Sequence, residues 1–134
     1  MRLASPFGAL EAQLVDGALL SLRFVEEEPG EALPTLEEFL QEKTPSLAPR
    51  GTAFQKRVWR RVLEIPRGET VTYGQLAKEL GTSPRAIGRA VAANPILILI
   101  PCHRVVAAGG APGGYAGGQA RKAALLAWEK QWPN

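Results

Sequence analysis

Two apolar stretches near the N-terminus predict a β-hairpin. Residues 8–15 and 18–25 are both rich in apolar side chains, and the pair Asp16-Gly17 joins them. Asp-Gly suits a tight type I′ turn, because both central residues of that turn need a positive φ. The hairpin is therefore expected to open the fold.

The remaining apolar patterns are mostly helical. A capping box, in which a threonine is followed three residues later by Glu or Gln, opens two of the stretches, at Thr35 and at Thr52. Gly81 ends another stretch, and Ser83-Pro84 is a typical start for the one that follows. The predicted helices cover residues 36–43, 52–65, 73–80, 84–93 and 119 to near the C-terminus.

A short apolar run follows the fourth of these helices. Residues 96–100 are all apolar, lie between two prolines and carry β-branched side chains at alternate positions. This length is typical of a fully buried strand and is too short for a helix. We therefore expect a buried strand that ends at Pro101, with Cys102 placed where the chain leaves the core.

The elements divide the chain into two parts of opposite charge. Residues 44–51 have the composition of a linker. Residues 1–48 hold three basic and nine acidic residues, a net charge of −6, whereas residues 49–134 hold thirteen basic and four acidic residues, a net charge of +9. We predict an α+β fold, with an N-terminal hairpin and helix lobe over residues 1–48 and a mostly α-helical, winged-helix-like domain over residues 49–134. The basic part indicates a polyanion such as nucleic acid, or else a basic surface without a partner.

The composition narrows the class of protein. A chain of 134 residues with 46% hydrophobic and 22% charged residues is typical of one soluble globular protein. No apolar run reaches the roughly 18–20 residues of a membrane span, and no signal peptide is evident, so we expect a cytoplasmic protein without membrane contact. Cys102 is the only cysteine and His103 the only histidine. An intramolecular disulfide is therefore impossible, and we expect neither a metal nor a cofactor.

The helices predicted over residues 73–80 and 84–93 have the outline of a helix-turn-helix motif. Two packed core helices would have the same outline. The second helix favours DNA binding because small residues leave its surface smooth around Arg85 and Arg89. It lacks long polar side chains for reading base edges, so we expect an arginine that enters the base stack or contacts phosphates.

Cys102 is the candidate nucleophile, although a lone cysteine beside an apolar run is most often a buried core residue. His103 and Arg104 follow it directly and are expected to favour the thiolate. Neighbouring residues in an extended chain point to opposite sides, so His103 would reach the sulfur through a water molecule. Glu129 is the acidic residue expected to orient the imidazole. Glycine-rich residues 109–118 would wrap a flat ligand.

The residues around Cys102 resemble the active-site motif of the 6-O-alkylguanine-DNA alkyltransferases, also called methylated-DNA–protein-cysteine methyltransferases. The motif here is Pro101-Cys102-His103-Arg104-Val105. The similarity covers residues 52–129 in order and spacing, and the N-terminal hairpin resembles the family's first lobe. The other matching segments are residues 68–77, Arg85 to Gly88, Asn94-Pro95, Gly114 to Gly118 and Lys122 to Glu129.

The resemblance implies DNA repair by a single, irreversible transfer. The family's cysteine attacks the alkyl carbon on 6-O-alkylguanine, which has been flipped out of double-stranded DNA bound through the minor groove, and it keeps the alkyl group. Carried over to this chain, His103 relays the proton of the Cys102 thiol through water and Glu129 holds His103. Tyr73 donates a proton or hydrogen bond to the leaving base and crowds a phosphate. Asn94 ties the turn to the active-site segment.

The resemblance also implies the residues that contact DNA and the base. Arg85 would fill the gap left by the flipped nucleotide, with Arg89 as the alternative, because the spacing from Tyr73 differs from that of some members. The other implied DNA contacts are Tyr73, Ala86, Gly88 and Arg104, and the implied pocket residues are Val105, Tyr115, Ala116 and Gly117. Ala116 stands where many members have serine, which removes one hydrogen bond from the pocket.

Two other functions stay open at this point. A non-catalytic relative would bind alkylated DNA and mark it for other repair, although such relatives typically lack the cysteine. A helix-turn-helix regulator with a structural cysteine would bind palindromic half-sites as a dimer. We expect a monomer that acts on alkylated DNA, with other repair proteins as further partners.

Overall fold

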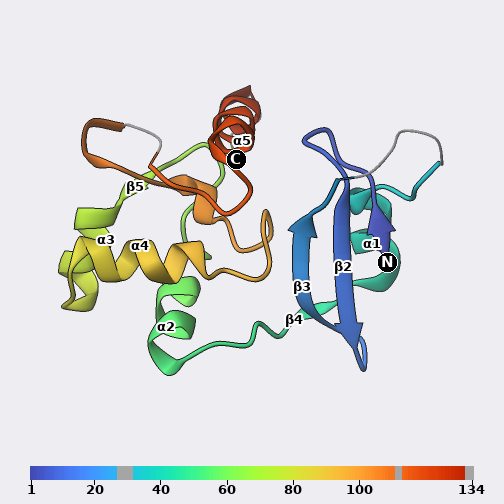
Figure 1. The fold of residues 1–134 in the computed structure, drawn as a ribbon, viewed down its shortest axis with the longest axis horizontal. Coiled ribbons are helices and arrows are strands. Elements are labelled where there is room, and N and C mark those ends of the chain that lie inside the picture. Colours follow the sequence, from blue (N-terminus) through green and yellow to red (C-terminus); the bar gives the residue numbers. More distant parts are fainter. Residues whose placement is uncertain (27–31, 111–112, 132–134) are drawn as a thin grey trace.

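The computed structural model describes residues 1–26, 32–110 and 113–131 (Figure 1). A small sheet and helix α1 lie at one end of the molecule, and the remaining helices lie at the other end. The elements of the first end are β1 (Arg2–Leu3), β2 (Leu10–Val15), β3 (Ala18–Phe24), α1 (Leu36–Lys43) and β4 (Ser46–Leu47). The elements of the second end are α2 (Ala53–Val62), β5 (Val71–Thr72), α3 (Tyr73–Leu80), α4 (Pro84–Ala92), η1 (Cys102–Arg104), β6 (Val105–Val106), η2 (Ala108–Gly110) and α5 (Gln119–Gln131).

The predicted hairpin is confirmed. Strands β2 and β3 pair antiparallel, and Asp16 and Gly17 turn the chain between them with φ values of 51° and 80°. β1 adds to β2, and β4 adds to β3 in parallel, which gives the order β1-β2-β3-β4. The capping box at Thr35 opens α1 as predicted.

The helix-turn-helix outline is also confirmed. Thr72 caps α3, Gly81 ends it in the left-handed conformation with a φ of 67°, and Ser83 caps α4 with Pro84 in its first turn. Helix α2 packs across this pair and is anchored to it by a hydrogen bond of 2.8 Å from Trp59 Nε1 to the carbonyl of Ala90. Strands β5 and β6 form a two-stranded parallel ladder beside the helices, so the predicted α+β, winged-helix-like fold is correct.

The strand expected at residues 96–100 is not formed. Ile96 makes one isolated bridge with Leu22, and the chain then turns back at Ile98, whose φ is 70°. The side chain of Asn94 explains the turn, because its Oδ1 accepts from the backbone N–H of Ile96 and its Nδ2 donates to the carbonyl of Ile100, both at 2.9 Å. Backbone groups that a neighbouring strand would have satisfied are satisfied by this amide instead.

One continuous core joins the two ends of the molecule. Leu22 of the sheet and Ile96 of the turn are both fully buried, and the core extends from them to Trp59 and Ile87 of the helices. Ala48, at the end of the sheet, still donates to the carbonyl of Leu19. A boundary between residues 48 and 49 therefore stays a prediction. None of the helices in the described ranges has the length and apolar character needed to cross a membrane.

Candidate active site

Cys102 lies at the start of the single turn η1, directly after the Asn94-stabilised turn. Its side chain is buried, and its backbone N–H donates to the carbonyl of Ile100 at 2.7 Å. Burial raises the pKa of the thiol to about 12, against the smaller lowering effects of a hydrogen bond with Asn94 and of the positive charge of Lys122. The resting group is therefore a neutral thiol at neutral pH.

This protonation state corrects the expectation that His103 and Arg104 favour the thiolate. Loss of water around a buried sulfur disfavours the anion more than the neighbouring groups favour it. Arg104 does not act on the thiol, because its guanidinium is held elsewhere, by Glu129 and by the carbonyl of Ile65. Ionisation of Cys102 at neutral pH would consequently require a base.

His103 and Glu129 form the pair that the sequence suggested. The imidazole is fully buried, and its Nε2 lies 3.1 Å from Oε1 of Glu129. By hydrogen-bond geometry neither ring nitrogen has a partner among the described protein groups, but Nε2 makes this ion-pair contact with Glu129 and Nδ1 makes none. A carboxylate on one side of the ring and an unpartnered nitrogen on the other is the arrangement of an oriented base.

Glu129 is shared between His103 and Arg104. Arg104 donates to its two oxygens at 2.6 to 3.2 Å and places a further N–H 2.6 Å from the carbonyl of Ile65. Burial alone would raise the pKa of Glu129, but the hydrogen bonds from His103 and Arg104 outweigh it and hold the pKa at about 2. The carboxylate is thus a permanent anion at physiological pH. Arg104 thus helps to hold this carboxylate, and the DNA contact expected for it stays a prediction.

Lys122 is a site residue that the sequence analysis did not single out. It is fully buried in the first turns of α5, and its Nζ donates to the carbonyls of Val105 and Gly114 at 2.6 and 3.1 Å and to the hydroxyl of Tyr73 at 3.4 Å. Burial lowers its pKa to about 8. Its spacing from Leu125 and Glu129 along one helical face was the available signal, because a buried stripe that includes two charged residues indicates a polar site.

A hollow of about 420 Å³ opens between α3, α4 and the pocket loop, defined as residues 113–118. Tyr73 and Tyr115 line it. Burial raises the pKa of both hydroxyls, and a negative charge on the nearby Cys102 raises these pKa values further. Of the four predicted pocket residues, Tyr115 and Ala116 line the hollow, whereas Val105 is buried behind it and Gly117 contacts Phe24 and Arg121. The other lining residues are Pro84, Gly88, Val91, Ala92 and Gly114.

The exposed side of α4 borders this hollow. Arg85 and Arg89 are exposed one turn apart, and neither has a hydrogen bond or ion pair with another described residue. Gly88, between them, lies in the wall of the hollow, where a Cβ would meet nothing within 4 Å. Ala86 is half-buried. The helix is therefore smooth beside two free guanidinium groups.

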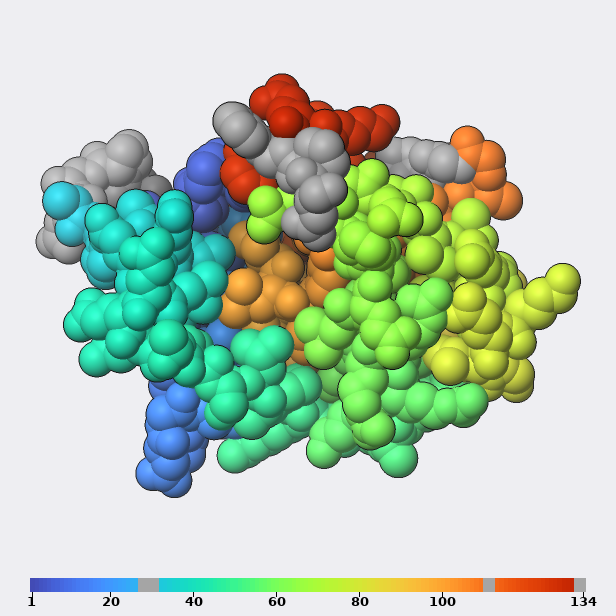
Figure 2. Space-filling model, turned by 180° about the vertical axis from the view of Figure 1, so that it is seen from behind, coloured from blue at the N-terminus to red at the C-terminus, as the bar shows by residue number. Residues whose placement is uncertain are grey.

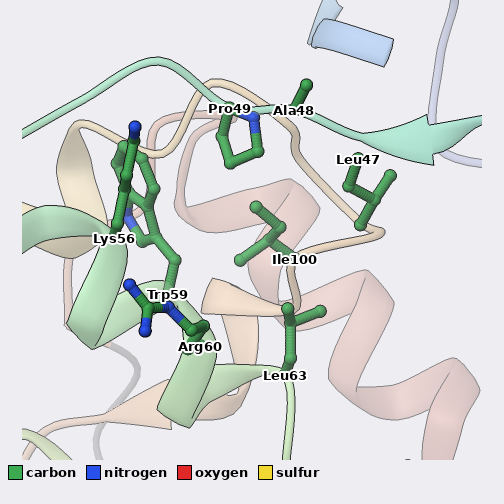
Figure 3. Close-up of a pocket in the computed structure, with 8 residues that line it drawn as sticks. All are labelled: Leu47, Ala48, Pro49, Lys56, Trp59, Arg60, Leu63 and Ile100. Atoms are coloured by element: carbon green, nitrogen blue, oxygen red, sulfur yellow. The ribbon is translucent and has the colours of Figure 1, made fainter. Parts of the chain in front are cut away.

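A second hollow, of about 310 Å³, lies behind the active-site turn. Leu47 and Pro49 border it on one side and Trp59 of α2 and Leu63, directly after α2, on the other, with Ile100 pointing into it (Figure 3). In Figure 2 an orange segment shows in a depression between the teal and the green parts of the chain. The second hollow itself is lined by residues of the segment before α2, of α2 and of the turn at Ile100. It contains none of the predicted site residues. Within the described ranges, no three His, Cys, Asp or Glu side chains are grouped as a metal site would require.

The comparison with protein families gives one match over the second part of the chain. The model described as 6-O-methylguanine DNA methyltransferase, DNA binding domain, matches residues 53–131. Among curated proteins, the methylated-DNA–protein-cysteine methyltransferase of Mycobacterium tuberculosis is 53% identical over 83 residues, which is 60% of this chain and 50% of that protein. The protein of the same name from Methanosarcina acetivorans is 53% identical over 85 residues, 62% of this chain and 54% of that protein. The aligned part thus spans about half the length of these relatives.

Solved structures resemble the whole chain. The crystal structure of Mycobacterium tuberculosis OGT in complex with DNA has a TM-score of 0.82 and 37% identity, and the match covers 97% of this chain and 91% of that one. S. pombe Atl1 in complex with damaged DNA containing O6-carboxymethylguanine has a TM-score of 0.52 and 30% identity, over 60% of this chain and 78% of that one.

Proposed function

Because the chain belongs to the 6-O-methylguanine DNA methyltransferase family, we propose that it repairs alkylated DNA by moving the alkyl group from guanine to Cys102. The single observation that carries this proposal is the buried Cys102 close to Tyr73 and Tyr115, which line a base-sized hollow, together with the buried His103–Glu129 pair that follows from the next residue. The substrate is 6-O-alkylguanine in double-stranded DNA, and each protein molecule acts once because a thioether has no easy leaving group.

The neutral thiol explains why a base is needed. His103 takes the thiol proton through a water molecule that bridges the sulfur and Nδ1, the ring nitrogen that no described protein group occupies. Glu129 stays ionised and stabilises the imidazolium that forms. The positive charge of Lys122 stabilises the thiolate before it attacks.

Transfer then exchanges one bond for another. The thiolate attacks the saturated alkyl carbon, the S–C bond forms and the C–O bond breaks, with both electrons of that bond leaving on the oxygen of guanine. Tyr73, whose hydroxyl is 3.2 Å from the carbonyl of Gly114 and 3.4 Å from Lys122 Nζ, supplies a proton to the leaving base. A base that leaves protonated is a better leaving group.

Access to the hollow requires that the damaged nucleotide leave the base stack. Flipping costs a few kcal/mol, which groove contacts must offset. The smooth α4 approaches the minor groove closely, Arg85 fills the space in the stack, and Arg89 contacts the backbone nearby. The freedom of both guanidinium groups in the resting protein supports these roles.

Transfer is favoured over the two alternatives. A non-catalytic relative needs the hollow but not the Cys102–His103–Glu129 arrangement, and a regulator with a structural cysteine needs neither the hollow nor the buried imidazole. A cytoplasmic location and a monomeric state stay predictions of the sequence.

Intact-protein mass spectrometry tests the proposal. Wild-type protein incubated with duplex DNA that contains 6-O-methylguanine is expected to gain the mass of one methyl group, and peptide mapping should place it on Cys102. Cys102→Ala should gain none and still bind the DNA. An unmodified wild-type protein, or a methyl group on another residue, would contradict the proposal.

A further inference from the structure

We propose that Arg121 is a positioning residue that fixes the pocket loop against the N-terminal end of the molecule, so that this end helps to set the rate of alkyl transfer. This inference rests on the proposed function, since it concerns the same hollow. Arg121 has no described hydrogen bond, ion pair or ring contact with Cys102 or α4, and it therefore acts through the loop.

The guanidinium of Arg121 joins three segments that are far apart in the sequence. Its Nε donates to the carbonyl of Phe7 at 3.0 Å, and its Nη1 donates to the carbonyl of Gly117 at 3.3 Å. Its central carbon lies 4.4 Å from the centre of the Phe24 ring, within the range of a cation–π contact. One side chain thus ties the turn before β2 and the end of β3 to the pocket loop.

The glycines at this contact fit the same arrangement. A Cβ on Gly8, whose φ is +133°, would lie 3.0 Å from Nη2 of Arg121. A Cβ on Gly117 would lie 2.9 Å from the Phe24 ring and 2.7 Å from the Tyr115 ring. Both glycines therefore permit an approach that a larger residue would prevent.

Arg121 and its neighbour Lys122 hold the two ends of the segment that lines the hollow. Lys122 holds the carbonyl of Gly114, and Arg121 holds the carbonyl of Gly117. The residues between these two anchors, Tyr115 and Ala116, form part of the wall against which the base would lie. Release of one anchor lets the wall shift, and small displacements of a positioning group reduce rates strongly.

The test compares single-turnover transfer by wild type, Arg121→Met, Arg121→Lys and Phe7→Leu on duplex DNA that contains 6-O-methylguanine. Phe7→Leu is the matched control, because the Phe7 ring makes a different contact between the same turn and α5, an edge-on contact of 6.1 Å with Trp128. Two quantities are measured for each protein: the transfer rate at saturating DNA and the DNA concentration that gives half of it. Thermal unfolding is measured in parallel.

Arg121→Met is expected to lower the saturating rate by about tenfold and to leave the half-saturating DNA concentration within about twofold. Arg121→Lys, which keeps one donor, should recover most of the rate. Phe7→Leu should lower the unfolding temperature and leave the rate within about twofold.

Three results would overturn the inference: an unchanged rate in Arg121→Met, a change confined to the half-saturating concentration, or an equal loss of rate in Phe7→Leu. These results differ from a failure of the proposed function itself, in which wild-type protein would acquire no methyl group.

Discussion

The centre around Cys102 and the exposed side of α4 are built in opposite ways. Cys102 and His103 are fully buried, and Glu129 is held by both His103 and Arg104. Arg85 and Arg89 are exposed and have no partner in the part of the chain that the structure describes. The chemistry is fixed in place before any substrate arrives, whereas the groups proposed to meet DNA are left free to adapt to it.

The difference has a thermodynamic consequence. A buried, paired group contributes to the folded state and to its function together, so its replacement should damage both. An exposed, unpaired group contributes little to stability, so its replacement should affect binding alone. Three substitution experiments can separate the two regions, and they follow from the largest expected effect to the smallest.

Replacement of the central carboxylate should give the largest effect. Glu129→Gln removes the anion that Arg104 and His103 share, and it is expected to slow transfer about a hundredfold and to lower the free energy of unfolding by about 3 kcal/mol. Single-turnover rates and urea unfolding at pH 7 measure both quantities. Both the transfer rate and the stability are therefore expected to fall on replacement of this one residue.

Glu79→Gln is the matched control for that variant, because Glu79 makes an exposed ion pair with Arg61 at 2.7 Å. It should change neither quantity measurably. Since the pKa of Glu129 is lowered from 4.5 to about 2, the difference in stability between wild type and Glu129→Gln should be complete above about pH 5 and be lost as the pH falls toward 2. A difference that persists at pH 2 would show that the ion pair is not its source.

The protonation state of Cys102 gives the second test. Because the pKa of the buried thiol is raised to about 12, the folded state keeps the proton that an unfolded chain loses near pH 8.5. Wild type should therefore lose stability relative to Cys102→Ala as the pH rises from about 8.5 toward 12, by about 2 kcal/mol at pH 10. Urea unfolding of both proteins under reducing conditions, from pH 7 to 10, measures this. Parallel curves would show that folding leaves the pKa of the thiol unchanged, and a gain in the relative stability of wild type between pH 7 and about 8.5 would show a thiolate in the resting protein. Either result would weaken the contrast between the regions.

The two arginines of α4 give the smallest effect, and their replacement should leave the stability of the fold unchanged. Arg85→Ala is expected to weaken binding to damaged duplex DNA about tenfold and to slow transfer at saturating DNA. The reason is that no side chain would then occupy the space that the flipped nucleotide leaves in the base stack. Arg89→Ala should weaken binding without a change in the saturating rate. Both should unfold within about 0.5 kcal/mol of wild type. Fluorescence anisotropy measures DNA binding, and single-turnover experiments measure the transfer rate. If Arg89→Ala slows transfer at saturating DNA and Arg85→Ala does not, Arg89 is the inserted residue.

Local signals in the sequence predicted the fold where neighbouring residues determine it. The Asp16-Gly17 turn, the capping boxes at Thr35 and Thr52 and the Ser83-Pro84 start all place their elements within a few residues of the observed ends. Each of these signals acts over a few positions of the chain, so no tertiary contact was needed to interpret it.

Contacts between distant residues account for what the sequence did not predict. Residues 96–100 have the pattern of a strand, but the Asn94 amide closes them into a turn. Arg104 donates to the carbonyl of Ile65, which is 39 positions away in the sequence. Its guanidinium is therefore held away from the Cys102 thiol. Burial of Lys122 depends on carbonyls from two other segments. His103 and Glu129 were brought together as expected, while their roles and that of Cys102 stay predictions.

The separation of charge along the molecule has a consequence for how it meets its proposed partner. The described residues of the acidic part, 1–26 and 32–48, lie at one end of the molecule, and α2, α3 and α4 of the basic part lie at the other (Figure 1), so charge is separated along the molecule. Near a polyanion such as DNA, the electric field of the polyanion exerts a torque on the protein. This torque turns α3 and α4 toward the polyanion before the two molecules are in contact. Salt shortens the range of this rotation to about 10 Å at 0.1 M ionic strength. At low salt, this orientation would raise the share of first collisions with the proposed DNA partner in which α3 and α4 face the DNA.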